Sequence, residues 1–267
     1  MVALYPIVKL DAKETYEVFR VAPVECIVVR LQDLVSKITF EFNKTYQDIV
    51  ASGGLHNFLG FGRHILLSLI MKDEIIANFQ PSKYAAAIKA LLPDSCTTMD
   101  GETYEGEYWV SSREIERIHS DNKELLNLCP NCRYIGLVKG CSENQIEHHT
   151  RLLRSLGITD FVFHTGDFLR HGDPNMIKKA RSYSYRIRKR VNRLFLYGIG
   201  IQNRLIEFSF ADAYISFKHF VTAKNGMALI GTKEMKYARD YDSTIMISNF
   251  IQMYKNVESL KEQRRLH

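Results

Sequence analysis

Three stretches of the chain are apolar almost throughout and end in polar or small residues. They cover residues 133–141, 160–167 and 193–200, and each precedes a segment with the composition of a helix. An apolar strand whose polar residues gather at its C-terminal end is typical of a parallel sheet that is buried on both faces. Ligands in such folds bind beyond the C-terminal ends of the strands. We therefore expect function at these three strand ends.

The same pattern predicts further strands and the helices between them. The strands are expected at residues 26–30, which we take as the first of the sheet, and at 63–71, 94–100 and 212–217. Pro81 suits the first position of a helix over 82–92. Ser111 and Glu114 resemble a capping box that starts a helix ending near residue 128. Further helices are expected at 142–156, 174–192 and 201–209.

The alternation of strands and helices with short connections indicates an α/β protein with a (β/α)8 TIM-type barrel, either complete or trimmed. We expect the barrel to occupy residues 1–232, with 233–267 as a helical C-terminal tail packing on it. An open doubly wound sheet is the alternative. Against it, Gly198 and Gly200 lack the third glycine of a dinucleotide-binding fingerprint.

Composition is that of an ordinary globular chain of 267 residues, 46% hydrophobic and 25% charged. No apolar run approaches the roughly 18 residues of a membrane span, and the N-terminus lacks the pattern of a secretory signal. Five cysteines are few for this length and odd in number. We expect a reduced, intracellular and cytoplasmic protein without membrane association.

The formal charge of +6 favours an anionic partner. Much of the excess falls between residues 178 and 193, where tyrosines are interleaved. Such a stretch can grip phosphates and stack bases, although the solvated outer face of a helix explains it equally well. The candidate nucleic-acid-binding residues are Arg181, Arg186, Arg188, Lys189 and Arg190.

A zinc site is not expected. Cys129 and Cys132 form a lone C-x-x-C motif, with Cys141, His148 and His149 further on. The motif precedes the strand 133–139 and Cys141 follows it, which separates them by roughly 20 Å. That distance exceeds any shared coordination shell. We expect thiols without a metal, and no cofactor.

Several segments in order resemble one known family, the guanine transglycosylases, which exchange a guanine in tRNA or DNA for a 7-deazaguanine base. The run 54–66 is similar to the family's Gly-Leu-His segment, and 81–100 to its helix and strand ending in a base-recognising aspartate. Residues 136–140, 197–200 and 212–226 resemble three later motifs, the last in its archaeosine-synthase form. The resemblance covers roughly residues 50–230.

The resemblance implies a transferase, a pentosyltransferase of queuosine- or archaeosine-type modification, with a TIM barrel and nucleic acid as partner. Asp100 stands at the position that reads the base, where a carboxylate can accept two N–H donors of a guanine-like edge. The family's strand-end glutamine is replaced by Lys139. Lys139 could bind phosphate, pair with Asp100 or attack an anomeric carbon, and pairing with an anion is the simpler role.

The sequence differs from the family at the residues that carry out the family's chemistry. Its nucleophilic aspartate aligns with Ile215, and its second aspartate aligns with Ser68 or, in another alignment, with Ala51. None of these side chains can stabilise or trap an oxocarbenium-like transition state as a carboxylate does. The family's C-terminal zinc site is also missing, since no cysteine lies beyond Cys141.

The remaining candidates lie mostly at the strand ends. Asp100, Asp167, Asp212 and His164 are the candidate catalytic residues, because carboxylates and an imidazole can act as acid, base or nucleophile. Helix capping is the alternative for Asp167, and a structural role for Asp212. The candidate substrate-binding residues are Asp100, Lys139, Gly140, Thr165, Gly166, Gly198 and Gly200.

Three functions remain open, and the first is favoured in its broad form, a transglycosylase-superfamily protein that acts on or binds nucleic acid. The chain is an exchange enzyme with relocated carboxylates, acting on DNA or tRNA with a 7-deazaguanine base. Alternatively it is a non-catalytic barrel that binds a base or nucleic acid and supports a catalytic family member, as a homo- or hetero-oligomer. The third is an unrelated lyase or phosphate-sugar enzyme on the same fold. The missing zinc subdomain tilts the expectation slightly towards DNA or towards a partner-dependent role.

Overall fold

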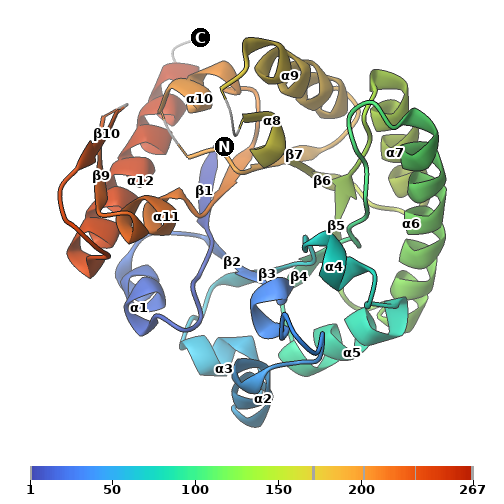
Figure 1. Ribbon diagram of the computed structural model, residues 1–267, viewed down its shortest axis with the longest axis horizontal. Helices are drawn as coiled ribbons and strands as arrows, with labels where there is room; N and C mark the ends of the chain where they lie inside the picture. Colours follow the sequence, from blue (N-terminus) through green and yellow to red (C-terminus); the bar gives the residue numbers. More distant parts are fainter. Residues whose placement is uncertain (1, 170–171, 201, 232, 266–267) are drawn as a thin grey trace.

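The computed structural model describes residues 2–169, 172–200, 202–231 and 233–265. Eight parallel strands form one sheet in the order β1-β8-β7-β6-β5-β4-β3-β2, with helices around it (Figure 1). This is a (β/α)8 TIM-type barrel, as the alternating pattern predicts. The strands are β1 (Ala3–Pro6), β2 (Cys26–Arg30), β3 (His64–Ser68), β4 (Ser95–Thr97), β5 (Arg133–Val138), β6 (Asp160–His164), β7 (Arg193–Tyr197) and β8 (Ala213–Ser216).

The barrel closes where its first and second strands meet. β1 pairs with β8 along its full length, from Ala3 with Ala213 onwards. On its other side, Ile7 forms an isolated parallel bridge with Val28 of β2, and the amide of Val8 donates to the carbonyl oxygen of Val28 at 2.9 Å. The closed ring leaves little of any strand edge unpaired.

A ring of helices covers the outside of the barrel. Its members, with shorter helical segments, are α1 (Lys13–Val21), η1 (Leu31–Leu34), α2 (Lys44–Ala51), α3 (Leu55–Leu59), α4 (Asp73–Ile76), α5 (Pro81–Leu91), α6 (Tyr108–Leu128), α7 (Glu143–Ser155), α8 (Gly166–Leu169), α9 (Pro174–Arg188), α10 (Gln202–Glu207), α11 (Lys218–Lys224) and α12 (Ser243–Arg265). Because these helices return antiparallel to the strands, their N-terminal ends lie near the C-terminal strand ends, at the barrel mouth.

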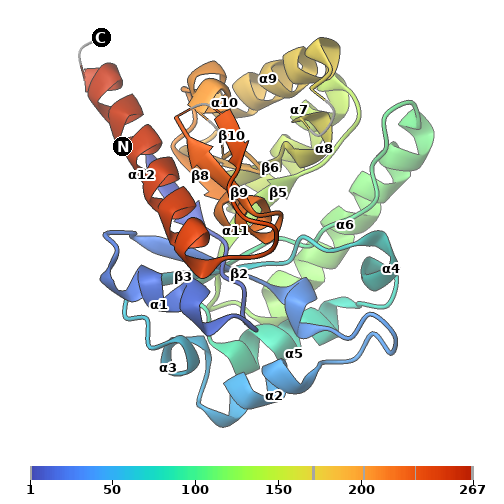
Figure 2. The ribbon, with the colours of Figure 1, turned by 60° about the vertical axis from the view of Figure 1, so that its left-hand side comes forward.

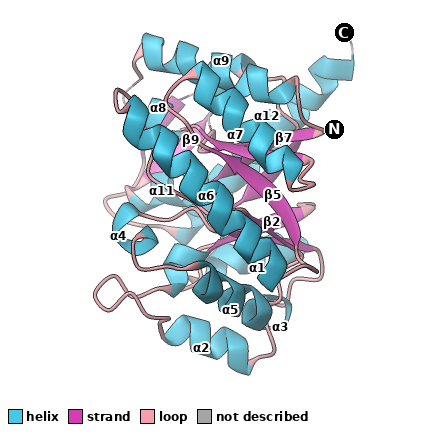
Figure 3. Ribbon diagram, turned by 90° about the vertical axis from the view of Figure 1, so that its right-hand side faces the viewer, coloured by secondary structure: helices cyan, strands magenta, loops and turns pink. Residues whose placement is uncertain are grey.

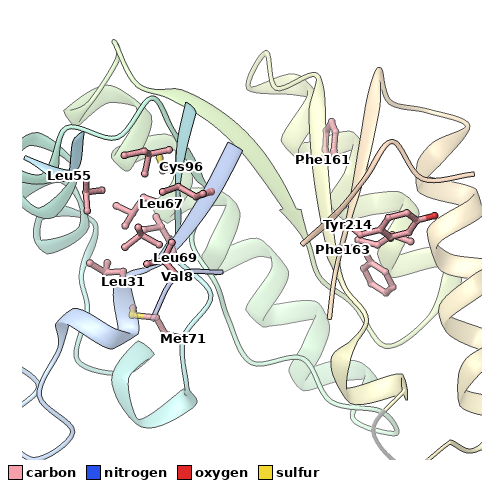
Figure 4. Packing of buried hydrophobic residues seen from close by; sticks show 14 of the residues in the cluster. Val8, Leu31, Leu55, Leu67, Leu69, Met71, Cys96, Phe161, Phe163 and Tyr214 are labelled. Carbon is pink, nitrogen blue, oxygen red and sulfur yellow. The ribbon is translucent and has the colours of Figure 1, made fainter. Parts of the chain in front are cut away.

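Two apolar layers hold the fold together. Inward-facing side chains, among them Val28, Leu137 and Ile215, form a buried cluster inside the barrel. Outward-facing side chains form a larger cluster between strands and helices, part of which Figure 4 shows around Leu67 and around Tyr214. Alternate residues of one strand thus serve both layers, which explains why the strands are apolar throughout.

The sequence misses the first strand. The segment 26–30, expected to begin the sheet, is β2, and β1 precedes it. β1 is only four residues long and ends in Pro6, which makes it a weak strand pattern. It is nevertheless part of the sheet because it pairs with β8 on one side and forms a bridge to β2 on the other.

The capping box expected at Ser111 is also wrong, because α6 begins at Tyr108. Ser111 is fully buried in the first turn, where its hydroxyl accepts a hydrogen bond from the amide of Tyr104 at 3.2 Å. It therefore fixes the preceding loop against the helix. Sequence spacing alone could not distinguish this role from a cap.

The C-terminal segment begins with a hairpin rather than a helix. β9 (Met227–Ile230) pairs antiparallel with β10 (Lys233–Lys236), and α12 follows. α12 packs against α1, α10, α11 and β1, which places it in the ring of helices (Figure 2). Residue 232, where we expected the barrel to end, lies outside the described residues.

Candidate functional site

A cavity of about 830 Å³ occupies the mouth of the barrel. Four strands contribute side chains from their C-terminal ends, namely Arg30, Lys139, His164 and Tyr197. Loops above the strands contribute Asp73, Tyr104, Glu105 and Asp167. The cavity lies where (β/α)8 barrels bind their ligands, and the strand ends singled out in the sequence contribute to its wall.

Lys139 and Asp100 form a buried ion pair at the edge of this cavity. The Lys139 ammonium lies 2.9 Å from Oδ1 of Asp100, and only 5% of the Asp100 side chain is exposed. Oδ1 also accepts from the amide of Gly101 at 2.8 Å, and Oδ2 from the amide of Met71 at 3.1 Å. Lys139 lines the cavity and Asp100 lies behind it. Of the roles open to Lys139, the structure shows the pairing with Asp100.

A buried histidine supports the lysine from behind. His149 of α7 is fully buried, and its Nδ1 accepts the backbone N–H of Lys139 at 3.0 Å. Burial lowers the pKa of His149 to about 3, so its ring is neutral at neutral pH and can accept this bond. The ring thereby fixes the backbone from which the Lys139 side chain extends.

Arg30 and Tyr197 also line the cavity. Arg30 makes a bidentate pair with Asp33 at 2.9 Å for both bonds and stacks over the ring of Phe217 at 4.3 Å. Burial raises the pKa of Tyr197 to about 12, although the charge of Arg30 and hydrogen bonding to Ser68 and Arg30 oppose the shift. The phenol is therefore protonated at neutral pH and serves as a hydrogen-bonding group.

His164 and Asp167 lie together at the end of β6. Nδ1 of His164 is 3.8 Å from Oδ2 of Asp167, too long for a direct hydrogen bond. The imidazole packs edge-on against Tyr197 at 5.1 Å between ring centroids. The Asp167 side chain is 68% exposed and lines the cavity. Both groups can therefore reach a molecule in the mouth.

The glycines and threonine of the predicted pocket have structural tasks. Thr165 is buried and its hydroxyl donates to the carbonyl oxygen of Tyr197 at 2.8 Å. Gly198 has φ of +100°, and a Cβ there would meet the backbone of Gly166 at 3.0 Å. A Cβ on Gly200 would lie 2.5 Å from the Ser216 hydroxyl. Neighbouring backbone and side-chain atoms fill the space that Gly198 and Gly200 leave.

Gly140 has a structural role as well. Its φ is +150°, and a Cβ there would approach Gln145 of α7 to 3.0 Å. This close approach lets α7 begin directly beside the strand end. Gly140 itself borders the cavity.

Asp212 does not join the mouth. It precedes β8, at the N-terminal edge of the parallel sheet, where Oδ2 accepts the amide of Leu194 at 2.8 Å and Arg188 pairs with it at 3.3 Å. His164 lies at the opposite end of the strands. The structure therefore places Asp212 outside any site that contains the other candidates.

The residues that the resemblance aligns with the family's two aspartates are Ile215 and either Ser68 or Ala51. Ile215 is fully buried among the inward-facing residues of the barrel. Ser68 ends β3 and is fully buried, whereas Ala51 ends the outer helix α2 and is exposed. Of the two alignments, only Ser68 stands at a strand end, beside Tyr197. No carboxylate occupies either strand position.

The basic residues of α9 are largely engaged with acidic neighbours. Arg186 pairs with Glu143 and with Glu147 of α7, the latter at 2.8 Å, and Arg190 pairs with Glu147 at 2.9 Å. Lys189 lies over the ring of Tyr185 at 4.5 Å. Much of this charge therefore serves to join α9 to α7, in line with the outer-face interpretation of the basic stretch. Binding of nucleic acid by these residues stays a prediction.

One cysteine of the C-x-x-C motif has a partner that spacing did not indicate. Sγ of Cys132 lies 3.2 Å from Sγ of Cys96 in β4, and hydrogen bonding from Cys96 lowers the pKa of Cys132. In the described ranges, no three His, Cys, Asp or Glu side chains are grouped as a metal would require.

Sequence reasoning missed Arg30 and Tyr197 as wall residues. Each is the last residue of a strand, so the strand-end criterion that selected Lys139 would also have found them. It also missed the loop contact in which the Tyr104 hydroxyl donates to Asp73 at 2.5 Å. Nothing in the sequence links those two positions.

No protein-family model matches the chain, and no curated protein matches it. Across the part of the chain that the structure describes, none of the helices combines the length and apolar character needed to cross a membrane. The (β/α)8 fold and the residues of the mouth cavity are therefore the features that point to a function.

Proposed function

We propose that this protein is a barrel of the guanine transglycosylase type that recognises a guanine or 7-deazaguanine base in nucleic acid, and that it binds the base without exchanging it by the family's aspartate mechanism. The observation that carries the proposal is the buried Lys139–Asp100 pair at the edge of the mouth cavity. It supplies a strong donor and a strong acceptor side by side.

A guanine-type base presents the matching groups. Its O6 and N7 are acceptors, and its N2 amino group is a donor. The Lys139 ammonium can donate to O6 or N7, and a carboxylate can accept from the amino edge. Asp100 already accepts Lys139 and two backbone amides, so its remaining capacity is small. When Lys139 turns from Asp100 to the base, Oδ1 becomes available to the base as well.

The absent carboxylates argue for recognition over exchange. Ile215 and Ser68 stand at the two strand positions where the family carries its aspartates, and neither can form or stabilise a glycosyl intermediate. A binding role, alone or beside a catalytic partner, uses the pocket and needs neither aspartate.

The test is calorimetric titration of the protein with guanine and 7-cyano-7-deazaguanine, with adenine as the mismatched base. We expect the two guanine-type bases to bind and adenine to bind at least tenfold more weakly. Lys139→Met removes the donor and is expected to weaken binding at least tenfold, while Lys139→Arg retains much of it. Circular dichroism checks that each variant is folded. Absence of binding by every guanine-type base, free or within an oligonucleotide, contradicts the proposal.

A second candidate is exchange through relocated groups, and one observation favours it. His164 and Asp167 both line the cavity and bring an imidazole and a carboxylate to its wall. A denaturing gel run after incubation with oligonucleotide and a 7-deazaguanine base distinguishes the two. A covalent adduct that Asp167→Asn abolishes supports exchange, and its absence leaves recognition.

A further inference from the structure

A second cavity, of about 550 Å³, lies outside the barrel between α6 and α7. The two helices run side by side on the outer face of the barrel (Figure 3). Both begin near the barrel mouth, and the cavity lies at their first turns, with Tyr108, Trp109 and Asn144 among its lining residues. We call this the α6–α7 groove. It is distinct from the mouth cavity, since the two share no lining residue.

The groove displays aromatic side chains that nothing covers in the described structure. The Trp109 indole is 77% exposed, and Tyr108 beside it is 43% exposed. Their rings meet edge to face, with centroids 5.4 Å apart. An exposed aromatic pair of this kind is costly in water and is typical of a surface that binds a partner. Trp109 is the only tryptophan of the chain.

The charge of the groove is positive. Arg113 follows Trp109 by one helical turn on α6, and Arg151 of α7 lines the facing wall. Both arginines belong to the exposed part of the surface. The one carboxylate of the lining, Glu116, is paired with His148 at 2.6 Å. The two guanidinium groups outnumber the one carboxylate, so the lining is net positive and an anion is the complementary ligand.

A buried glutamine joins the groove to the mouth. Nε2 of Gln145 donates to the carbonyl oxygen of Tyr108 at 2.7 Å and to the Ser112 hydroxyl at 2.8 Å. Its Oε1 accepts the amide of Cys141 at 2.9 Å, and Cys141 lines the mouth cavity. The aromatic pair is thus held in register with the strand end that carries Lys139. A ligand in the mouth and one in the groove lie on adjoining surfaces.

We propose that the α6–α7 groove binds single-stranded nucleic acid, with one base stacked on Trp109 and the backbone phosphates held by Arg113 and Arg151. A flat apolar ring beside two guanidinium groups fits a nucleotide, which combines a π-face with a phosphate. An acidic peptide would use the arginines but leave the indole without a stacking partner. This proposal rests on the proposed function, because the nucleic-acid strand bound in the groove is the one whose base enters the mouth cavity.

The single tryptophan makes the test direct. A short single-stranded oligonucleotide is titrated into the full chain while Trp109 fluorescence is recorded. We expect saturable quenching, and at least a tenfold loss of affinity for Trp109→Ala in an anisotropy assay with labelled oligonucleotide. Trp109→Phe, which keeps a stacking ring, is expected to retain most of the affinity. The side chain is exposed, so these changes leave the fold intact.

The arginines are tested through the salt dependence of binding. For a single strand, each neutralised phosphate contributes about 0.7 to the slope of log affinity against log salt concentration, so Arg113→Gln with Arg151→Gln is expected to lower the slope by about 1.4. The matched control is Lys44→Gln with Lys255→Gln, which removes the same charge from α2 and α12. The control is expected to change the slope much less.

Three results would overturn the groove proposal. They are unchanged fluorescence on saturation with oligonucleotide, equal effects of the two double variants, and binding of polyglutamate or heparin as tight as that of the oligonucleotide. The mouth is judged separately by titration with free base. Equal quenching by oligonucleotides with and without guanine, together with no binding of free guanine-type base, supports the groove and contradicts base reading. Binding of free base without quenching by oligonucleotide contradicts the groove proposal and supports base reading.

Discussion

The Lys139 ammonium lies 2.9 Å from the carboxylate of Asp100, although 39 residues separate them in the chain. Neighbouring parallel strands, β4 and β5, bring the two together at the barrel mouth. The carboxylate is nearly buried and is held by two backbone amides, and Lys139 is its counter-ion. This pair places one cationic and one anionic group at the edge of the mouth cavity.

A double-mutant cycle measures this dependence. Lys139→Met leaves a buried carboxylate without its counter-ion, and we expect the free energy of unfolding to fall by about 3 kcal/mol. In the double variant with Asp100→Asn, part of that loss is recovered, with a coupling energy of at least about 1 kcal/mol in urea unfolding. The exposed pair Lys83–Glu41 is the control, and its coupling should stay below about 1 kcal/mol. Additive effects at Lys139 and Asp100 would contradict this view of the site.

Ile215→Asp tests whether the family nucleophile can simply be restored. Ile215 is fully buried among apolar neighbours inside the barrel, so a carboxylate there loses its hydration without gaining a partner. We expect an unfolding free energy lower by about 4 kcal/mol, against about 1 kcal/mol for Ile215→Val. Thermal and urea unfolding give both values. A stable Ile215→Asp protein that forms a covalent adduct with nucleic acid would show that the position is still competent.

His219 is expected to make the protein sensitive to mild acid. It is fully buried between Phe19, Phe217 and Phe250, and burial lowers its pKa to about 3. Neither ring nitrogen has a hydrogen-bond partner among the described residues. Below about pH 6.5 the unfolded chain binds a proton that the folded protein does not. Stability should therefore be unaffected above that pH and fall as the pH decreases towards 3.

The comparison of wild type with His219→Leu isolates this contribution. Between pH 6 and pH 5 the wild type should lose about 1 kcal/mol more of its unfolding free energy than the variant. Urea unfolding at pH 7, 6 and 5 provides the values. Parallel losses in the two proteins would mean that His219 is not the group responsible. His149, with a pKa also lowered to about 3, contributes in the same direction and is left unchanged.

The strand pattern predicts much of the fold because it is local. The strands expected at 26–30 and 133–139 match β2 and β5 to within a residue, since each is a continuous apolar run bounded by polar residues. The pattern does not predict β1, because the stability of β1 comes from pairing with a strand far along the chain. The hairpin of β9 and β10, which carries no such run, is likewise absent from the prediction.

The candidate site was likewise predicted only in part. That polar strand ends would gather at one rim follows from parallel strands alone, and Lys139, His164 and Asp167 do line one cavity. Asp212, which stands at the start of its predicted strand and had a structural role as its alternative, precedes β8 and lies at the other rim. The direction of a strand matters as much as its composition.

The sequence by itself determined the class of fold and the rim at which chemistry is expected. Hydrophobic periodicity and strand direction are local properties that can be read from the order of residues. Only the tertiary structure decided the partner of each charged or polar group. It paired Lys139 with Asp100 and the arginines of α9 with acids of α7, and it left Trp109 exposed beside Arg113. Such contacts depend on the curvature of the barrel and on helix packing, which bring together residues that no local pattern relates.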